Sequence, residues 1–147
     1  MKKIALSDID LDDQELNNVS NVLKSKWLSM GKVTQEFEQR FANYLKIKNA
    51  IAVSNGTAAL HIANLALGIK PDDEVIVPSL TFVATSNSVL YTGAKPVFAD
   101  VESYDNFNIS PESIEAKVTK KTKAIIVVHY GGYACDMKRI LEIAEDK

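Results

Sequence analysis

Two long stretches without any charged residue constrain the fold of this chain more than any other feature of its sequence. They cover residues 49–69 and 75–94. Each is long enough to span a membrane, but both contain several Ser, Thr, Asn and Gly residues, whose polar atoms are costly in lipid. We therefore expect these stretches to form a protein interior that is buried on two sides, with no membrane contact.

The composition excludes several other classes of protein. With 147 residues, 46% hydrophobic and 24% charged, the chain is neither disordered nor fibrous. A formal net charge of -2 gives no basic surplus, so we expect no nucleic-acid partner. The single cysteine, Cys135, excludes an internal disulfide, and two histidines are too few for most metal sites. The segment that begins Met1-Lys2-Lys3 lacks the apolar core of a signal peptide, so a cytoplasmic protein is expected.

The first 48 residues are expected to form a helical segment of their own. Leu16, Val19 and Leu23 recur at helical spacing behind a possible cap at Asp12 or Asp13. A second helix is expected around Phe37, Phe41, Tyr44 and Leu45, and residues 27–31 separate the two helices.

From residue 49 onward the pattern changes to alternating strands and helices. Short apolar runs predict strands over residues 50–53, 74–77, 96–99 and 124–128, and helices are expected at 57–67, at 81–91, from Pro111, and from Asp136 to Glu145. Continuously apolar strands are typical of a mostly parallel sheet with helices on both faces. We thus expect an α/β fold over residues 49–147.

The segment Ser54–Leu60 is the most informative for function. It follows a predicted strand and opens a predicted helix, and the free N–H groups and positive dipole at a helix N-terminus attract anions. Gly56 permits a tight turn, and the following alanines allow close approach of a ligand. An ordinary strand–helix turn capped by Asn55 explains the same residues equally well.

Two further segments follow predicted strands at the same edge of the sheet. Phe82 lies where α/β proteins bind ligands and is able to stack on a flat ring, although a core phenylalanine is the more common case. His129 and Tyr130 precede Gly131-Gly132, which suits either a ligand site or a loop that needs glycine conformations.

Two single residues allow several interpretations. Trp27 is the only tryptophan, and it fits a core anchor, a substrate contact or a subunit interface. Cys135 is conceivable as a thiolate paired with His129, but an inert buried thiol is the simpler interpretation.

Several long motifs resemble those of the DegT/DnrJ-type sugar aminotransferases and occur in the same order and spacing. These are fold type I enzymes that use pyridoxal 5'-phosphate (PLP). The resemblance covers nearly the whole chain. It is carried by residues 54–60, 73–85, 93–101 and 121–137, and the segment Trp27–Gly31 is similar to the start of these enzymes. It implies that residues 49–147 are the front part of the large PLP-binding domain.

The resemblance implies roles for individual residues. Thr57 and Ala58 would hold the PLP phosphate, Gly56 would shape the turn, and Phe82 would stack on the pyridine ring. Trp27 and His129 are candidates for substrate contact. The implied reaction moves an amino group, usually from glutamate, to a keto sugar on a nucleotide carrier in amino-sugar or polysaccharide biosynthesis. The implied assembly is a homodimer.

The residues that perform the chemistry in this family match no position here. The Schiff-base lysine and the aspartate that bonds the pyridine nitrogen are expected beyond Lys147, so the chain is an expected amino-terminal fragment that is inactive alone. Two alternatives stay open. One is a sugar 3-dehydrase of the same family, and the other is a non-catalytic α/β module that binds a phosphorylated ligand.

Overall fold

A computed structural model describes residues 8–146, and the chain divides into two compact units, Met1–Ala52 and Val53–Lys147. The first unit contains α1 (Asp13–Ser25) and α2 (Lys32–Leu45). Asp12 caps α1 by accepting a hydrogen bond from the Gln14 N–H, and the Glu15 side chain accepts in return from the Asp12 N–H. This reciprocal capping satisfies N–H groups that have no acceptor inside the helix.

The turn between α1 and α2 is shaped by Trp27. The indole Nε1 donates to the Met30 carbonyl at 3.1 Å. A Cβ atom on Gly31 would lie 2.5 Å from this nitrogen, so any larger residue at position 31 would collide with the indole. The glycine is therefore required by close approach.

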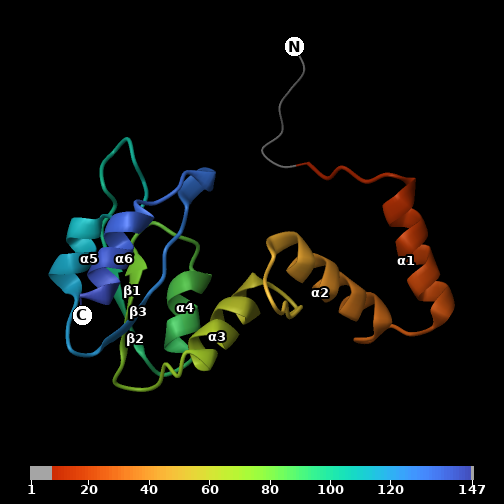
Figure 1. The fold of residues 1–147 in the computed structure, drawn as a ribbon, viewed down its shortest axis with the longest axis horizontal. Helices are drawn as coiled ribbons and strands as arrows, with labels where there is room; N and C mark the ends of the chain where they lie inside the picture. Colours follow the sequence, from red (N-terminus) through yellow and green to blue (C-terminus); the bar gives the residue numbers. More distant parts are fainter. Residues whose placement is uncertain (1–7, 147) are drawn as a thin grey trace, which may run out of the picture. The chain divides into compact units, whose positions relative to one another are not determined.

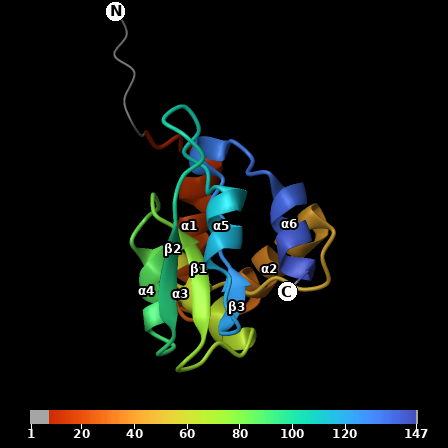
Figure 2. The same cartoon turned by 90° about the vertical axis from the view of Figure 1, so that its left-hand side faces the viewer.

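The second unit is built around a parallel sheet of three strands, with the order β2-β1-β3. Figures 1 and 2 show helices on both faces of this sheet. The strands are β1 (Glu74–Pro78), β2 (Lys95–Ala99) and β3 (Thr122–Ile125), and the helices of this unit are α3 (Gly56–Ala66), α4 (Ala84–Leu90), α5 (Pro111–Lys117), η1 (Tyr130–Gly132, a 3₁₀ turn) and α6 (Met137–Glu145). The expected α/β class with a parallel sheet is confirmed.

The alternation of side chains along β1 creates two cores. Ile76 faces α5 and α6 and packs with Ile114 and Ile140, whereas Val75 and Val77 face the opposite side and pack around α4. The side chains of Val75, Ile76 and Val77 are all fully buried. The central strand is thus apolar on both faces, as its sequence predicts.

Two expectations about strands are wrong. Residues 50–53 form no strand, because none of the described residues supplies a neighbouring strand for them to pair with. The last strand ends at Ile125, earlier than the apolar run to Val128 indicated, although the Ile126 N–H still donates to the Ile76 carbonyl.

The expectation of two-sided burial holds for residues 75–94 in part and fails for residues 49–69. Of the latter stretch only Asn64 and Ile69 are buried, and Leu65 and Leu67 are exposed. Within the second unit α3 packs mainly against α4. None of the described helices is long and apolar enough to cross a membrane.

Glu74 at the start of β1 makes the stability of this unit depend on pH. Its carboxylate accepts hydrogen bonds from the Thr119 hydroxyl at 2.7 Å and from the Lys95 ammonium at 3.2 Å. These bonds, the first more than the second, hold the pKa of Glu74 below its ordinary value of 4.5.

A lowered pKa in the folded state means that the carboxylate stabilises the fold above the unfolded pKa, and that this contribution is lost as the pH falls through the folded pKa. We expect Glu74→Gln to lower the free energy of unfolding near neutral pH, with the difference from wild type vanishing in acid. Urea unfolding of both proteins across this range checks it. A difference that is constant with pH would contradict the assignment.

Candidate functional site

Three segments of the second unit lie near the carboxyl ends of its strands. In Figure 1, α3 and α4 both begin at the end of the sheet toward which β1 points. Residues 79–83 leave β1 at that edge, where the Ser79 N–H donates to the Ala99 carbonyl of β2. Residues 126–135 leave β3 at the same edge because the strands are parallel. This is the edge at which α/β proteins bind ligands.

The N-terminus of α3 offers hydrogen-bond donors to an anion. Asn55 caps the helix, and its Oδ1 accepts from the Ala58 N–H at 2.9 Å. Gly56 and Thr57 are the first two helical residues, whose N–H groups have no acceptor within a helix. The Ala58 amide is already used by the cap, so a phosphate would need to displace Asn55 to receive it.

The space in front of this helix is open. Gly56 is exposed, and a Cβ atom built on it would meet nothing within 4 Å. Two free amides, the Thr57 hydroxyl and the positive end of the helix dipole form a donor set suited to a phosphate group. The residues present therefore fit the phosphate of PLP, with Gly56 and Thr57 better placed than Ala58.

Phe82 lies in the turn between β1 and α4. Its side chain is 76% exposed, so the alternative of a core phenylalanine is wrong for the described residues. The turn is held by a hydrogen bond between the Thr81 and Thr85 hydroxyls at 2.8 Å and by the Thr85 N–H, which donates to the Phe82 carbonyl. A fixed backbone with an exposed ring is what stacking on a planar ligand requires.

A buried hydrogen bond joins the two helices that carry these features. Asn64 of α3 donates through Nδ2 to the Ser88 hydroxyl of α4 at 3.1 Å, and Ser88 in turn donates to the Thr85 carbonyl. Asn64 and Ser88 are both buried. The bond fixes α3 relative to α4, and hence the free amides relative to the Phe82 turn.

His129 follows β3, and its ring is oriented by the loop behind it. The Cys135 N–H donates to His129 Nδ1 at 3.1 Å. The Cys135 thiol donates to the Val128 carbonyl, and burial raises the pKa of this thiol. The thiolate pair considered for Cys135 and His129 is therefore not formed. Gly131 and Gly132 both have positive φ, so the loop does need glycine there.

Because Cys135 is 5% exposed and its pKa is raised, we expect it to react slowly with a thiol reagent such as dithionitrobenzoate. Unfolding in guanidinium should accelerate the reaction strongly. The rate of thionitrobenzoate release in native and denaturing buffer checks this. Equal rates in both buffers would show that the thiol is accessible in the folded chain.

Trp27 and two lysines next to strands, Lys95 and Lys123, have simpler surroundings. Trp27 belongs to the first unit and is 62% exposed. Lys95 begins β2 at the opposite edge of the sheet and pairs with Glu74, and Lys123 lies near the start of β3. Neither lysine is placed to replace the expected Schiff-base lysine.

The described residues contain no group of three or more His, Cys, Asp and Glu that could hold a metal ion.

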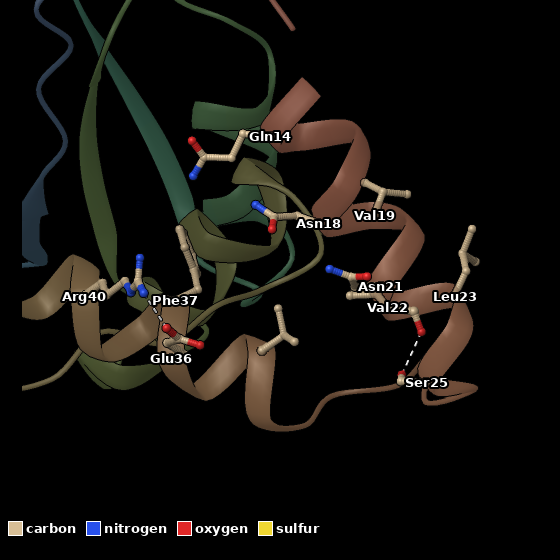
Figure 3. A pocket seen from close by; sticks show the side chains of 11 residues that line it. Gln14, Asn18, Val19, Asn21, Val22, Leu23, Ser25, Glu36, Phe37 and Arg40 are labelled. Atoms are coloured by element: carbon tan, nitrogen blue, oxygen red, sulfur yellow. Dashed lines mark hydrogen bonds and ion pairs between the residues drawn. The ribbon is translucent and has the colours of Figure 1, made fainter. Parts of the chain in front are cut away.

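A pocket of the first unit lies between α1 and α2. Its volume is 740 Å³. In Figure 3, Gln14 and Asn18 of α1 and Phe37 of α2 point toward this space, and Glu36 pairs with Arg40 at its border. None of the site residues expected from the sequence lines this pocket.

One residue near the carboxyl edge of the sheet, Asn108, was not predicted from the sequence. Asn108 is 1% exposed, and its side chain binds the backbone of the loop after β3. It stands in a polar stretch that gives no signal for burial, and its partners are 22 and 25 residues away in sequence.

Comparison with known proteins identifies the family. The model of the DegT/DnrJ/EryC1/StrS aminotransferase family matches residues 9–147. The chain therefore belongs to this family of PLP-dependent aminotransferases, and the expected fold type I is confirmed.

Individual relatives agree with this membership. The chain is 47% identical to the spore coat polysaccharide biosynthesis protein SpsC of Bacillus subtilis, over 90% of this chain and 34% of the relative. It is 45% identical to GDP-perosamine synthase of Escherichia coli O157:H7, over 100% of this chain and 40% of the relative. It superimposes on the putative sugar aminotransferase Spr1654 of Streptococcus pneumoniae, PMP-form, with a TM-score of 0.92 and 32% identity, over 99% of this chain and 36% of the other.

The chain thus spans between a third and two fifths of the length of these relatives.

Proposed function

We propose that this chain is the cofactor-binding front part of an aminotransferase that moves an amino group to a keto sugar carried on a nucleotide. One observation carries the proposal: a helix N-terminus with two free amides is fixed by a buried hydrogen bond to the helix that follows an exposed phenylalanine. The first element suits a phosphate and the second a planar ring, and PLP combines both groups.

The roles of the residues follow from this arrangement. The amides of Gly56 and Thr57 bind the cofactor phosphate, and the Thr57 hydroxyl adds a further donor. Phe82 covers one face of the pyridine ring and excludes water from it. When bound, PLP supplies the electron sink for amino transfer. We expect Ala58 to join the phosphate site only if Asn55 gives up its cap.

The substrate and the assembly are proposed from the relatives and from the surface. The name GDP-perosamine synthase supports a nucleotide-linked sugar, and the name spore coat polysaccharide biosynthesis protein supports a role in polysaccharide biosynthesis. Glutamate is proposed as the amino donor. Exposed apolar side chains on α1 and α2, such as Leu23 and Phe37, support a homodimer. Trp27 is proposed to contact the sugar, and the protein is proposed to act in the cytoplasm.

The proposal predicts that the purified 147-residue chain forms no amino sugar from PLP, glutamate and a nucleotide-linked 4-keto sugar. The reason is that Lys95 and Lys123 lie toward the edge of the sheet opposite the proposed site, where neither is placed to bind the cofactor covalently. Product formation is measured by chromatography, with an intact family member as the positive control. Measurable turnover by the chain alone would contradict the prediction.

The coding sequence that follows codon 147 tests the proposed function itself. We expect it to encode a strand that ends in an aspartate and, further on, a lysine in a serine-rich loop. A stop codon directly after Lys147 in the source DNA would favour a free-standing binding module instead.

A further inference from the structure

The loop after β3 is tied to the loop after β2 by one buried side chain. Asn108 Oδ1 accepts a hydrogen bond from the Tyr130 N–H at 2.9 Å, and Asn108 Nδ2 donates to the Tyr133 carbonyl at 3.1 Å. These two bonds use both ends of the amide and therefore define its orientation. The Asn108 main chain is also bound: its N–H donates to Asn106 Oδ1, and its carbonyl accepts from the Glu102 N–H.

The contacts of Asn108 lie on both sides of the glycine pair. Tyr130 precedes Gly131 and Tyr133 follows Gly132, so the amide closes the turn formed by the two glycines. An edge-to-face contact between the Phe107 and Tyr130 rings, with centroids 5.4 Å apart, supports the same arrangement. The path of residues 130–135 thus depends on a residue from a different loop.

That path decides which nitrogen of His129 carries the proton. The loop returns the Cys135 N–H to within 3.1 Å of His129 Nδ1, which has to be unprotonated in order to accept it. A neutral imidazole with a lone pair at Nδ1 carries its hydrogen on Nε2. A flipped ring would leave the Cys135 amide facing a carbon, without an acceptor.

We propose that Asn108 is a positioning residue that fixes His129 as its Nε2–H tautomer. His129 is exposed at the carboxyl edge of the sheet, so the neutral ring presents a hydrogen-bond donor there and not a base. A ligand bound at this edge meets the imidazole with an oxygen acceptor, such as a phosphate or carbonyl oxygen. Only this last statement rests on the proposed function, since the tautomer is a property of the chain without ligand.

Nitrogen-15 NMR of the chain without PLP tests the inference, at a pH at which the imidazole is neutral. Long-range proton–nitrogen spectra separate protonated from unprotonated ring nitrogens, and His129→Gln identifies which of the two histidines gives each signal. We expect protonated Nε2, unprotonated Nδ1, and a scalar coupling across the hydrogen bond from the Cys135 amide nitrogen to Nδ1. A hydrogen on Nδ1 would overturn the inference.

The role of Asn108 is tested by two variants and a matched control. Asn108→Ala should abolish the coupling and turn the single tautomer into a mixture. Asn108→Asp keeps the acceptor for Tyr130 but loses the donor to Tyr133, so we expect a weakened coupling, and this variant serves if the alanine variant does not fold. Asn64→Ala removes another buried amide and should leave the His129 signals unchanged. Wild-type signals in both Asn108 variants would contradict the positioning role, even if PLP binding failed for other reasons.

Discussion

Replacing Ile76 by alanine is expected to lower the free energy of unfolding of the second unit by about 3–4 kcal/mol. Ile76 is fully buried on the central strand, and it packs in the cluster that joins β1 to α5 and α6. Its removal leaves a cavity between elements that are held by the sheet on one side and by the helices on the other. Domains of this size are stable by roughly 5–15 kcal/mol, so this is a large fraction of the total.

Urea unfolding followed by circular dichroism measures this loss for Ile76→Ala against wild type. Leu67→Ala is the control, because Leu67 is 70% exposed at the end of α3 and should cost less than about 0.5 kcal/mol. Equal losses for the two variants would show that the β1 core does not form as described.

The second large effect is expected at the start of α3. Gly56→Pro removes one of the two free amides but not the helix, because proline is favoured at the first helical position and Asn55 already has the extended backbone that precedes proline well. α5 carries Pro111 at this position. The lost charge-assisted hydrogen bond corresponds to roughly 1.5–3 kcal/mol, or about 10–150-fold weaker binding of PLP.

Isothermal titration calorimetry of the chain with PLP measures this change in affinity. Asp13→Pro is the matched control, since Asp13 is the first residue of α1 in the other unit. It should leave the affinity at the wild-type value, and the helix content of both variants should match wild type. An unchanged affinity in Gly56→Pro would exclude this amide from the phosphate site.

Features that depend on neighbouring residues were predictable from the sequence. The caps considered at Asp12 and Asn55 are both present, because a capping side chain binds amides two or three residues ahead. Ser110 and Asp136 cap α5 and α6 in the same way. Gly68 follows the C-cap of α3 with positive φ, a conformation that glycine favours after a helix. Local chemistry therefore fixed most helix starts.

Features that depend on distant partners were not predictable in this way. The apolar run at residues 50–53 has strand composition but no neighbouring strand among the described residues, and composition alone carries no information about pairing. Phe82 is exposed although a phenylalanine in an uncharged stretch is more often buried. Asn108 acts through backbone groups more than twenty residues away.

The proposed cofactor site likewise combines local features, which the sequence predicts, with a contact between distant residues, which it does not. Its phosphate donors come from one helix start and were visible in the sequence, together with the aromatic residue that follows β1. The buried bond between Asn64 and Ser88, which fixes these two parts relative to each other, spans 24 residues and was not visible. The sequence thus predicted the residues of the proposed cofactor site, and the structure added the hydrogen bond that joins their two helices.

The most direct test of the central claim is to follow the backbone amide signals of the nitrogen-15-labelled chain while PLP is added, and to repeat the titration with pyridoxal, which lacks the phosphate. The account predicts saturable shifts that are largest at Gly56 and Thr57 and that nearly vanish with pyridoxal. Largest shifts at another place in the chain, or equal shifts with both compounds, would contradict a phosphate site at the start of α3.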